Sequence, residues 1–224
     1  MGRVRGAAIA DLLAGATQAG SSAERLAEGA LLLRGFARDE GASLMAALEA
    51  VLAAAPLRHM ITPGGYRMSV AMSNCGRAGW VTDRCGYRYD ALDPLTGAPW
   101  PVLPAAFLSL SRRAAAASGY AGFTPDACLI NRYEPGARLT LHQDKNERDF
   151  TTPIVSVSLG LPAVFLFGGA QRTDTARRIR LESGDVAVWG GPARLTFHGV
   201  MPLGDGEDAL TGRCRFNLTL RKAL

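Results

Sequence analysis

The strongest constraint on the fold is a run of short strand-like segments that fills the chain from Ala127 onward. Each segment is rich in β-branched or aromatic residues, and turns with Gly, Pro, Asn or Asp separate the segments. We expect strands over residues 127–133, 138–144, 153–160, 163–168, 177–182, 185–189, 194–200 and 213–221. Short strands in this number favour a double-stranded β-helix, or jelly roll, in a mainly β fold with flanking helices.

The first half of the chain has a different character, because Ala and Leu recur there at helical spacing. We expect one strand over residues 30–36 and helices over residues 7–19, 39–55 and 105–118. A chain of 224 residues fits a single domain. Within residues 1–224 we distinguish a helical N-terminal part, a lid and a jelly-roll core, over residues 1–60, 61–92 and 123–222.

The composition argues against several classes of protein. No run of 18 apolar residues occurs, so we expect no membrane span. The basic start and the Ala/Leu-rich run after it imitate a signal peptide, but Asp11 interrupts that run and favours an ordinary helix. The four cysteines form no CxxC pair, which argues against structural zinc and favours reduced thiols in the cytoplasm. The net charge of +5 is weak evidence for a polyanionic partner.

Residues 66–90 combine aromatic side chains, arginines and glycines with few helix formers. Aromatic faces stack on bases and arginines neutralise phosphates, so the segment suits a nucleotide-recognition lid. A small hairpin with arginines on its solvent side would have the same composition. Composition alone leaves both interpretations open.

His142 and Asp144 are two residues apart and would share one face of an extended strand. A third metal ligand would have to be His59 or His198, the only other histidines. His59 follows the end of a helix and suits a surface or packing role, which leaves His198. Two histidines and one carboxylate leave coordination positions open, which suits Fe(II) oxygen chemistry. The alternative is a jelly-roll binding module without redox activity, in which these residues are structural.

The last strand separates apolar from polar side chains. Its polar face carries Arg215, Asn217, Thr219 and Arg221. Two guanidiniums on one face suit a dicarboxylate, because each can hold a carboxylate through two parallel hydrogen bonds. An outer strand with a solvated face would show the same alternation. A second strand carries Asn131 and Tyr133 on one face, where an amide and a phenol could join the same pocket.

In this order, the motifs resemble the AlkB family of Fe(II)/2-oxoglutarate dioxygenases, which dealkylate nucleic acids. The resemblance spans roughly residues 30–222. It rests on Asn131-Arg132-Tyr133, Leu141-His142-Gln143-Asp144-Lys145, Arg215-Phe216-Asn217-Leu218-Thr219-Leu220-Arg221, Thr62-Pro63-Gly64-Gly65-Tyr66 and Met72-Ser73-Asn74-Cys75-Gly76. It implies an enzyme that uses Fe(II), with 2-oxoglutarate and O₂ as co-substrates.

The resemblance also implies roles for individual residues. The iron ligands would be His142, Asp144 and His198. Arg215 would pair with the C1 carboxylate of 2-oxoglutarate and Arg221, a catalytic residue, with its distal carboxylate. The rest of the co-substrate pocket would be Asn131, Tyr133 and Asn217. The substrate would contact Met72, Trp80, Tyr87, Asn146 and Arg172, with Trp80 and His142 on either side of a flipped base.

The implied reaction is oxidative demethylation of bases such as 1-methyladenine and 3-methylcytosine in DNA, with release of formaldehyde, succinate and CO₂. Single-stranded DNA would be favoured, RNA is a further substrate to test, and the enzyme would be a cytoplasmic monomer. Asn146 departs from the family, which has an acidic residue there, so base preference is the open question. A 2-oxoglutarate dioxygenase for a small molecule or a protein side chain is the alternative within the enzymes.

Overall fold

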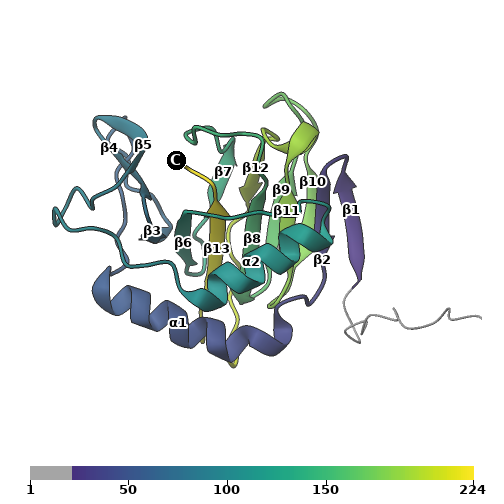
Figure 1. Cartoon of the computed structure of the whole chain (residues 1–224), viewed down its shortest axis with the longest axis horizontal. Coiled ribbons are helices and arrows are strands. Elements are labelled where there is room, and N and C mark those ends of the chain that lie inside the picture. The colour runs from purple at the N-terminus through teal and green to yellow at the C-terminus, as the bar shows by residue number, and fades with distance from the viewer. Residues whose placement is uncertain (1–21) are drawn as a thin grey trace, which may run out of the picture.

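Two β-sheets face each other in the computed structural model, and two helices cover the outer face of the larger sheet (Figure 1). The structure describes residues 22–224, so the helix expected over residues 7–19 lies outside the described part. The mainly β fold with a jelly-roll core and flanking helices is confirmed. None of the described helices is long and apolar enough to cross a membrane.

The larger sheet has seven strands in the order β1-β2-β11-β8-β13-β6-β3. Every neighbouring pair is antiparallel. The strands are β1 (Ala23–Ala27), β2 (Ala30–Leu33), β3 (Ala71–Gly76), β6 (Ala127–Tyr133), β8 (Ile154–Gly160), β11 (Val186–Trp189) and β13 (Arg215–Arg221). Because β13 lies between β8 and β6, neither of its edges is free, and only its two faces differ.

The smaller sheet has four strands in the order β10-β9-β12-β7. Its strands are β7 (Leu139–His142), β9 (Ala163–Phe167), β10 (Arg177–Leu181) and β12 (His198–Val200). A separate antiparallel hairpin, which we call the lid hairpin, consists of β4 (Gly79–Asp83) and β5 (Gly86–Asp90). In Figure 1 it projects beside the open end of the two sheets.

The helices α1 (Gly41–Ala54) and α2 (Ala105–Ala117) bury apolar side chains against the larger sheet. In α1, Leu44, Leu48 and Val51 follow the helical repeat and are almost completely buried. They belong to the same apolar cluster as Leu218 and Leu220 of β13. Burial of each such side chain stabilises the fold by about 1.5–3 kcal/mol.

The predicted separation of the faces of β13 is confirmed. Its apolar side chains lie in the cluster beneath the helices, and its polar side chains line a pocket between the sheets. The same alternation holds in β6, where Asn131 and Tyr133 line that pocket while Cys128 and Ile130 lie in the helix-side cluster.

Within its described residues 22–60, the N-terminal part contains more strand than expected. It contributes both β1 and β2 to the larger sheet, whereas the sequence predicted only one strand over residues 30–36. Strand β1 is a short edge strand with a single large apolar side chain, the buried Leu26, so it lacks the apolar alternation by which strands are recognised.

The range expected to form the lid also contains a core strand. Strand β3 pairs with β6 along its whole length and therefore belongs to the larger sheet. Of the three strands within residues 71–90, only β4 and β5 form the separate hairpin. Strands β7 and β12 both fall short of their predicted bounds. Strand β7 ends at His142, and β12 begins at His198 because a 3-10 turn (Gly191–Ala193) and a bend precede it.

Candidate functional site

A pocket of about 550 Å³ lies between the two sheets and next to the lid hairpin. It is lined by every residue that the sequence predicted for the site, namely Asn131, Tyr133, His142, Asp144, His198, Arg215, Asn217, Arg221, Met72, Trp80, Tyr87, Asn146 and Arg172. His59 is not among the lining residues, and its Nδ1 lies 2.9 Å from the carbonyl oxygen of Met68. The structure therefore brings together residues that are up to 149 positions apart in the chain.

Three of these residues form a cluster suited to a metal ion. One ligand atom from each of His142, Asp144 and His198 lies within 4.8 Å of the other two. Asp144 Oδ1 lies 3.9 Å from Nε2 of His142, and Asp144 Oδ2 lies 3.5 Å from Nε2 of His198. His142 ends β7 and pairs directly with His198, which begins β12. Cross-strand pairing thus fixes two ligands, and the segment after β7 supplies the third.

The backbone sets the tautomer of both histidines. Nδ1 of His142 lies 2.8 Å from the carbonyl oxygen of Thr140, and Nδ1 of His198 lies 2.9 Å from that of Thr196. A carbonyl oxygen can only accept, so each Nδ1 carries the proton and donates it. The lone pair of each Nε2 is therefore directed at the site, as metal ligation requires.

The surroundings keep His142 and Asp144 in the protonation states that a metal needs. Partial burial and the neighbouring His198 lower the pKa of His142 to about 4. Burial by itself would raise the pKa of Asp144. The nearby Arg221 and His198 lower this pKa by more, so the net pKa lies below the usual value. Neutral imidazoles and an ionised carboxylate form a 2-His-1-carboxylate donor set, which fits Fe(II) and leaves positions open.

Arg221 is the cation next to this cluster. Its Nη2 donates to Asp144 Oδ2 at 2.6 Å, and both side chains are buried. Burial by itself would lower the pKa of Arg221, but the contacts with Asp144 and the polar groups around it raise the pKa above the usual value. The guanidinium therefore stays charged at the edge of the metal site.

Arg215 lies at the other end of β13, away from the three ligands. It is 2 % exposed, its Nη2 donates to Ser158 Oγ at 2.9 Å, and its guanidinium lies 5.1 Å from the centre of the Tyr133 ring. Among the described residues its Nε and Nη1 have no hydrogen-bond partner. Burial raises the pKa of Tyr133 to about 12, so the phenol stays protonated and can donate. A carboxylate would satisfy these unpaired donors.

The contacts of the two arginines favour the opposite assignment to the one expected from the sequence. Arg215 was expected at the C1 carboxylate of 2-oxoglutarate and Arg221 at the distal one. The C1 carboxylate of 2-oxoglutarate adjoins the keto group that would bind the metal, and Arg221 is the arginine that contacts a residue of the metal-binding cluster. The spacing along β13 could not show which end of the strand meets β7 and β12.

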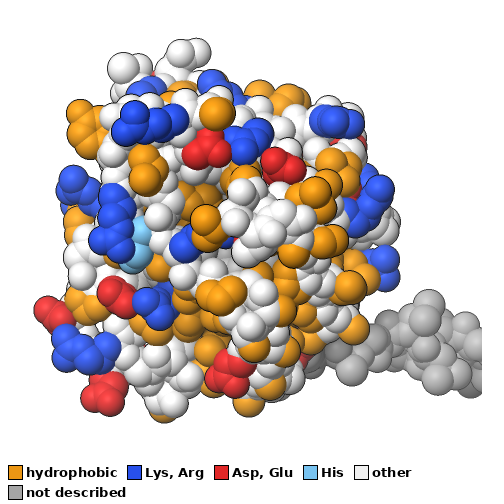
Figure 2. All heavy atoms as spheres, turned by 90° about the vertical axis from the view of Figure 1, so that its left-hand side faces the viewer, with side chains coloured by type: hydrophobic (Ala, Val, Ile, Leu, Met, Phe, Trp, Pro, Cys, Tyr) orange, Lys and Arg blue, Asp and Glu red, His pale blue; other side chains and the backbone are white. Residues whose placement is uncertain are grey.

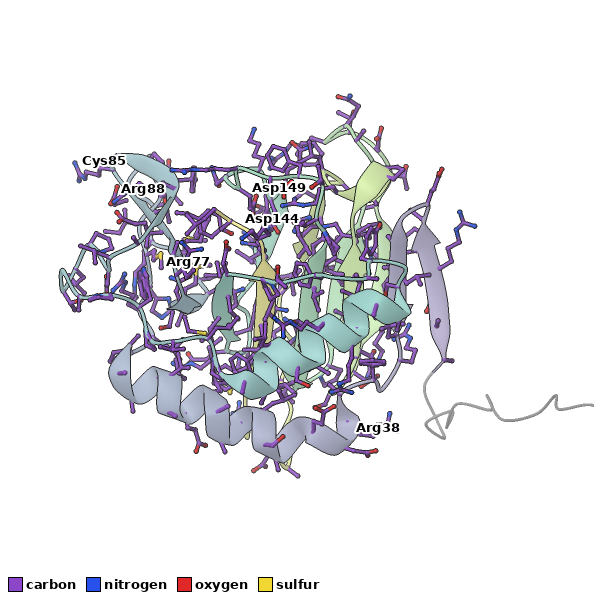
Figure 3. All side chains as sticks on the ribbon, viewed as in Figure 1. Arg38, Arg77, Cys85, Arg88, Asp144 and Asp149 are labelled. Atoms are coloured by element: carbon purple, nitrogen blue, oxygen red, sulfur yellow. The ribbon has the colours of Figure 1, made fainter. Side chains whose placement is uncertain are left out.

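The lid hairpin supplies the aromatic wall. The rings of Trp80 and Tyr87 stack with centroids 5.8 Å apart and planes 24° apart. The side-chain amide of Asn74 holds the backbone of Trp80, because its Oδ1 accepts from Trp80 N at 2.9 Å and its Nδ2 donates to Trp80 O at 3.0 Å. Trp80 Nε1 in turn donates to Asn146 Oδ1 at 3.1 Å. In Figure 3, Asp144 lies at the end of the sheets that is next to the lid hairpin, whose position Arg88 marks.

Sequence reasoning missed several polar residues around Arg221. Tyr89, Glu147 and Arg194 contact it directly or through one another, and all three are far from it in sequence. Glu147 follows Asn146 in a segment that reads as a solvated loop, so the sequence gives no indication that its carboxylate is buried. Tyr89 stands out in the sequence only as one of several lid aromatics.

Comparison with known proteins agrees with this geometry. The sequence profile of the 2OG-Fe(II) oxygenase superfamily matches residues 29–221. The alpha-ketoglutarate-dependent dioxygenase AlkB of Salmonella typhimurium strain LT2 is 58% identical over 89% of this chain and 93% of that protein. The Escherichia coli K12 protein of the same name is 56% identical over the same shares.

A solved structure supports the fold as well. The structure titled "The structure of OsALKBH1" superposes with a TM-score of 0.79 and 30% identity over 90% of this chain and all of that chain. The chain therefore belongs to the AlkB dioxygenases of the 2OG-Fe(II) oxygenase superfamily.

Proposed function

We propose that this protein oxidatively demethylates N-alkylated bases such as 1-methyladenine and 3-methylcytosine in nucleic acid, with single-stranded DNA as the preferred substrate. The observation that carries the proposal is the shared pocket, which joins a 2-His-1-carboxylate cluster, two buried arginines and an aromatic wall. Bound Fe(II) would supply the oxidation of the N-methyl carbon by O₂, coupled to conversion of 2-oxoglutarate to succinate and CO₂. The remaining roles fall to this chain's own residues.

On the co-substrate side, Arg221 would hold the C1 carboxylate beside the metal, and Arg215 with Tyr133 would hold the distal carboxylate. The donors of Arg215 that have no partner among the described residues support this assignment, because a buried guanidinium is poorly stabilised without an acceptor. Asn131 and Asn217 would complete the site. Asn131 Nδ2 donates to Asn217 Oδ1 at 3.2 Å, so the two amides fix each other's orientation.

On the substrate side, Trp80 and His142 would enclose the flipped base, with Met72 and Tyr87 against its faces and edges. N-Methylation at the pairing edge gives 1-methyladenine and 3-methylcytosine a positive charge and weakens pairing. A weakly paired base is easier to flip, which favours its selection. A cation also suits an aromatic wall. Asn146, with its Oδ1 on Trp80, would meet the edge of the base.

Basic residues around the pocket would hold phosphates without reading sequence. Arg67, Arg77 and Arg84 of the lid region and Arg172 at the pocket rim are exposed. Figure 2 shows the lid-bearing face of the molecule, where Lys and Arg side chains are spread over the upper part and along the left edge. This distribution supports a polyanionic substrate better than a small molecule or a protein side chain.

The test is a panel of methylated oligonucleotides incubated with the protein, Fe(II), 2-oxoglutarate and O₂. We expect formaldehyde and succinate in equal amounts from single-stranded DNA, with less from duplex DNA, and RNA is included for comparison. Asp144→Ala removes a metal ligand and should abolish both products, whereas Asp149→Ala, which changes an acidic residue of the same loop outside the pocket lining, should not. Absence of formaldehyde with every oligonucleotide would reject the proposal.

A cytoplasmic location and a monomeric state complete the proposal. The four cysteines are unpaired, which is consistent with a reducing compartment. Size-exclusion chromatography with light scattering would test the monomer.

A further inference from the structure

A buried carboxylate and a phenol contact Arg221 at the two guanidinium nitrogens that do not contact Asp144. The Glu147 side chain is only 1% exposed, and its Oε1 lies 3.4 Å from Arg221 Nε. Tyr89 of β5 bridges the two, because its hydroxyl accepts from Arg221 Nη1 at 2.8 Å and donates to Glu147 Oε1 at 3.0 Å. Asp144 at Nη2 and Tyr89 at Nη1 are hydrogen-bonded to the Arg221 guanidinium, whereas Nε faces Glu147 as an ion pair without a hydrogen bond.

The carboxylate of Glu147 is itself held from two sides. Arg194 is buried, and its Nη2 lies 3.3 Å from Glu147 Oε2. Arg194 Nη1 also donates to the backbone carbonyl of Asp144 at 2.9 Å. The cluster thus contains two carboxylates and two guanidiniums, whose charges balance. A buried charge without such partners would be strongly unfavourable, so each member of the cluster depends on the others.

The hydroxyl of Tyr89 connects this cluster to the lid hairpin, because this one oxygen is hydrogen-bonded to both Arg221 and Glu147. Tyr89 lies in β5 opposite Trp80 of β4, the ring proposed to stack on the base. Burial raises the pKa of Tyr89 above its usual value, so the phenol keeps the proton that it donates to Glu147. The position of β5 and the orientation of Arg221 are therefore joined through one residue.

We propose that Tyr89 and Glu147 are positioning residues that aim Arg221 at the co-substrate carboxylate and couple this orientation to docking of the lid hairpin. The inference rests on the proposed role of Arg221 at the C1 carboxylate. When the hairpin is docked, the Tyr89 hydroxyl holds Nη1 and leaves Nη2 directed at the metal side. When the hairpin moves away, Arg221 loses one of its three contacts.

Coupling of this kind is reciprocal. If docking of the lid hairpin strengthens binding of 2-oxoglutarate, then bound 2-oxoglutarate must strengthen binding of a nucleic acid that uses the docked lid. The two affinities should change by the same factor. Loss of the Tyr89 hydroxyl should reduce that factor toward one while leaving the metal ligands in place.

The experiment compares Tyr89→Phe with Tyr66→Phe, which removes the same hydroxyl from an exposed lid tyrosine outside the pocket lining. Binding is measured by calorimetry with Mn(II) in place of Fe(II), so that no turnover occurs. For Tyr89→Phe we expect an unchanged Kd for Mn(II) and a Kd for 2-oxoglutarate raised about tenfold, as for one hydrogen bond to a charged group. Tyr66→Phe should match the wild type.

The second readout is the Kd for a methylated oligonucleotide with and without 2-oxoglutarate, again with Mn(II). The ratio of the two values should exceed one in the wild type and in Tyr66→Phe, and approach one in Tyr89→Phe. In turnover with Fe(II), Tyr89→Phe should raise the KM for 2-oxoglutarate and retain kcat when 2-oxoglutarate is saturating. A loss that was only structural would lower the folded fraction and leave the KM unchanged.

Glu147→Gln gives a second test, because it keeps the shape and the acceptor for Tyr89 but removes the charge beside Arg221. Like Tyr89→Phe, this variant should raise the Kd for 2-oxoglutarate. Two results would overturn the inference, even if Glu147→Gln failed to fold. One is an unchanged Kd for 2-oxoglutarate in Tyr89→Phe, and the other is a wild-type oligonucleotide Kd that is the same with and without 2-oxoglutarate. Failure of the proposed function looks different, since the wild type itself would then release no formaldehyde.

Discussion

Arg221 and Asp144 form a buried ion pair in which guanidinium Nη2 lies 2.6 Å from carboxylate Oδ2. This pair places one cation of β13 against a metal ligand. Arg215, on the same face of the same strand, instead contacts Ser158 and the Tyr133 ring. Two arginines with such different neighbours suit the two different carboxylates of one keto acid.

Arg215→Gln and Arg221→Lys should separate the two carboxylate sites. We expect Arg215→Gln to raise the KM for 2-oxoglutarate about 10- to 100-fold, the range for charge-assisted hydrogen bonds lost from one carboxylate. The same variant should use 2-oxovalerate, which lacks the distal carboxylate, as well as the wild type does. Arg221→Lys loses the fork geometry and should raise the KM for both keto acids. The reverse pattern would restore the order expected from the sequence.

Asn74 should control substrate binding through Trp80, although the two side chains belong to different sheets. Asn74→Ala removes two partly buried hydrogen bonds to the backbone of Trp80, together worth roughly 2 kcal/mol. We expect the KM for methylated oligonucleotide to rise about tenfold and the KM for 2-oxoglutarate to stay unchanged. Steady-state kinetics with each substrate varied in turn would show this.

Ser73→Ala is the matched control for Asn74→Ala. Ser73 is also buried in β3, but its hydroxyl donates to the carbonyl oxygen of Ala55 on the opposite face of the strand. It should reduce the free energy of unfolding without raising the oligonucleotide KM. Equal effects of the two variants on that KM would mean that Asn74 acts through general stability alone.

The sequence predicted the chemistry of the site better than its geometry. Period-two alternation in β13 and β6 identified the pocket-facing residues, because one face of each strand is apolar and packs beneath the helices. Which arginine meets the metal depends on how β13 runs relative to β7 and β12, and alternation carries no information about that. The position of the third ligand, by contrast, followed from the scarcity of histidines.

The contacts that position Arg221 could not be predicted for a related reason. Glu147 and Arg194 are charged residues in irregular segments, where composition indicates solvent exposure. Their burial results from mutual pairing across 47 positions of the chain, which no local pattern records. Strand β1 was missed because its pairing with β2 and its place at the sheet edge are tertiary features.

Asn146→Asp should change base preference. A carboxylate can still accept from Trp80 Nε1, but it adds a negative charge at the proposed edge of the base. At this exposed site the added charge would strengthen the interaction with a cationic base by about 1 kcal/mol, or roughly fivefold. We expect kcat/KM to rise for cationic 1-methyladenine relative to neutral 3-methylthymine. Arg148→Gln changes the net charge equally at an exposed position of the same loop outside the pocket lining, and it should leave this ratio unchanged.

His142 should make the stability of the metal-free protein depend on pH. Its pKa is lowered to about 4, so between about pH 6.5 and 4 an unfolded chain takes up a proton at this residue while the folded protein does not. The free energy of unfolding should therefore fall as the pH falls through this window, by less than a fully buried group would give, since the side chain is 38% exposed. Urea unfolding at about pH 7, 6 and 5 measures the slope, and His142→Asn should make it shallower. Equal slopes in the two proteins would show that His142 titrates normally and that its neutral form is not favoured by the fold.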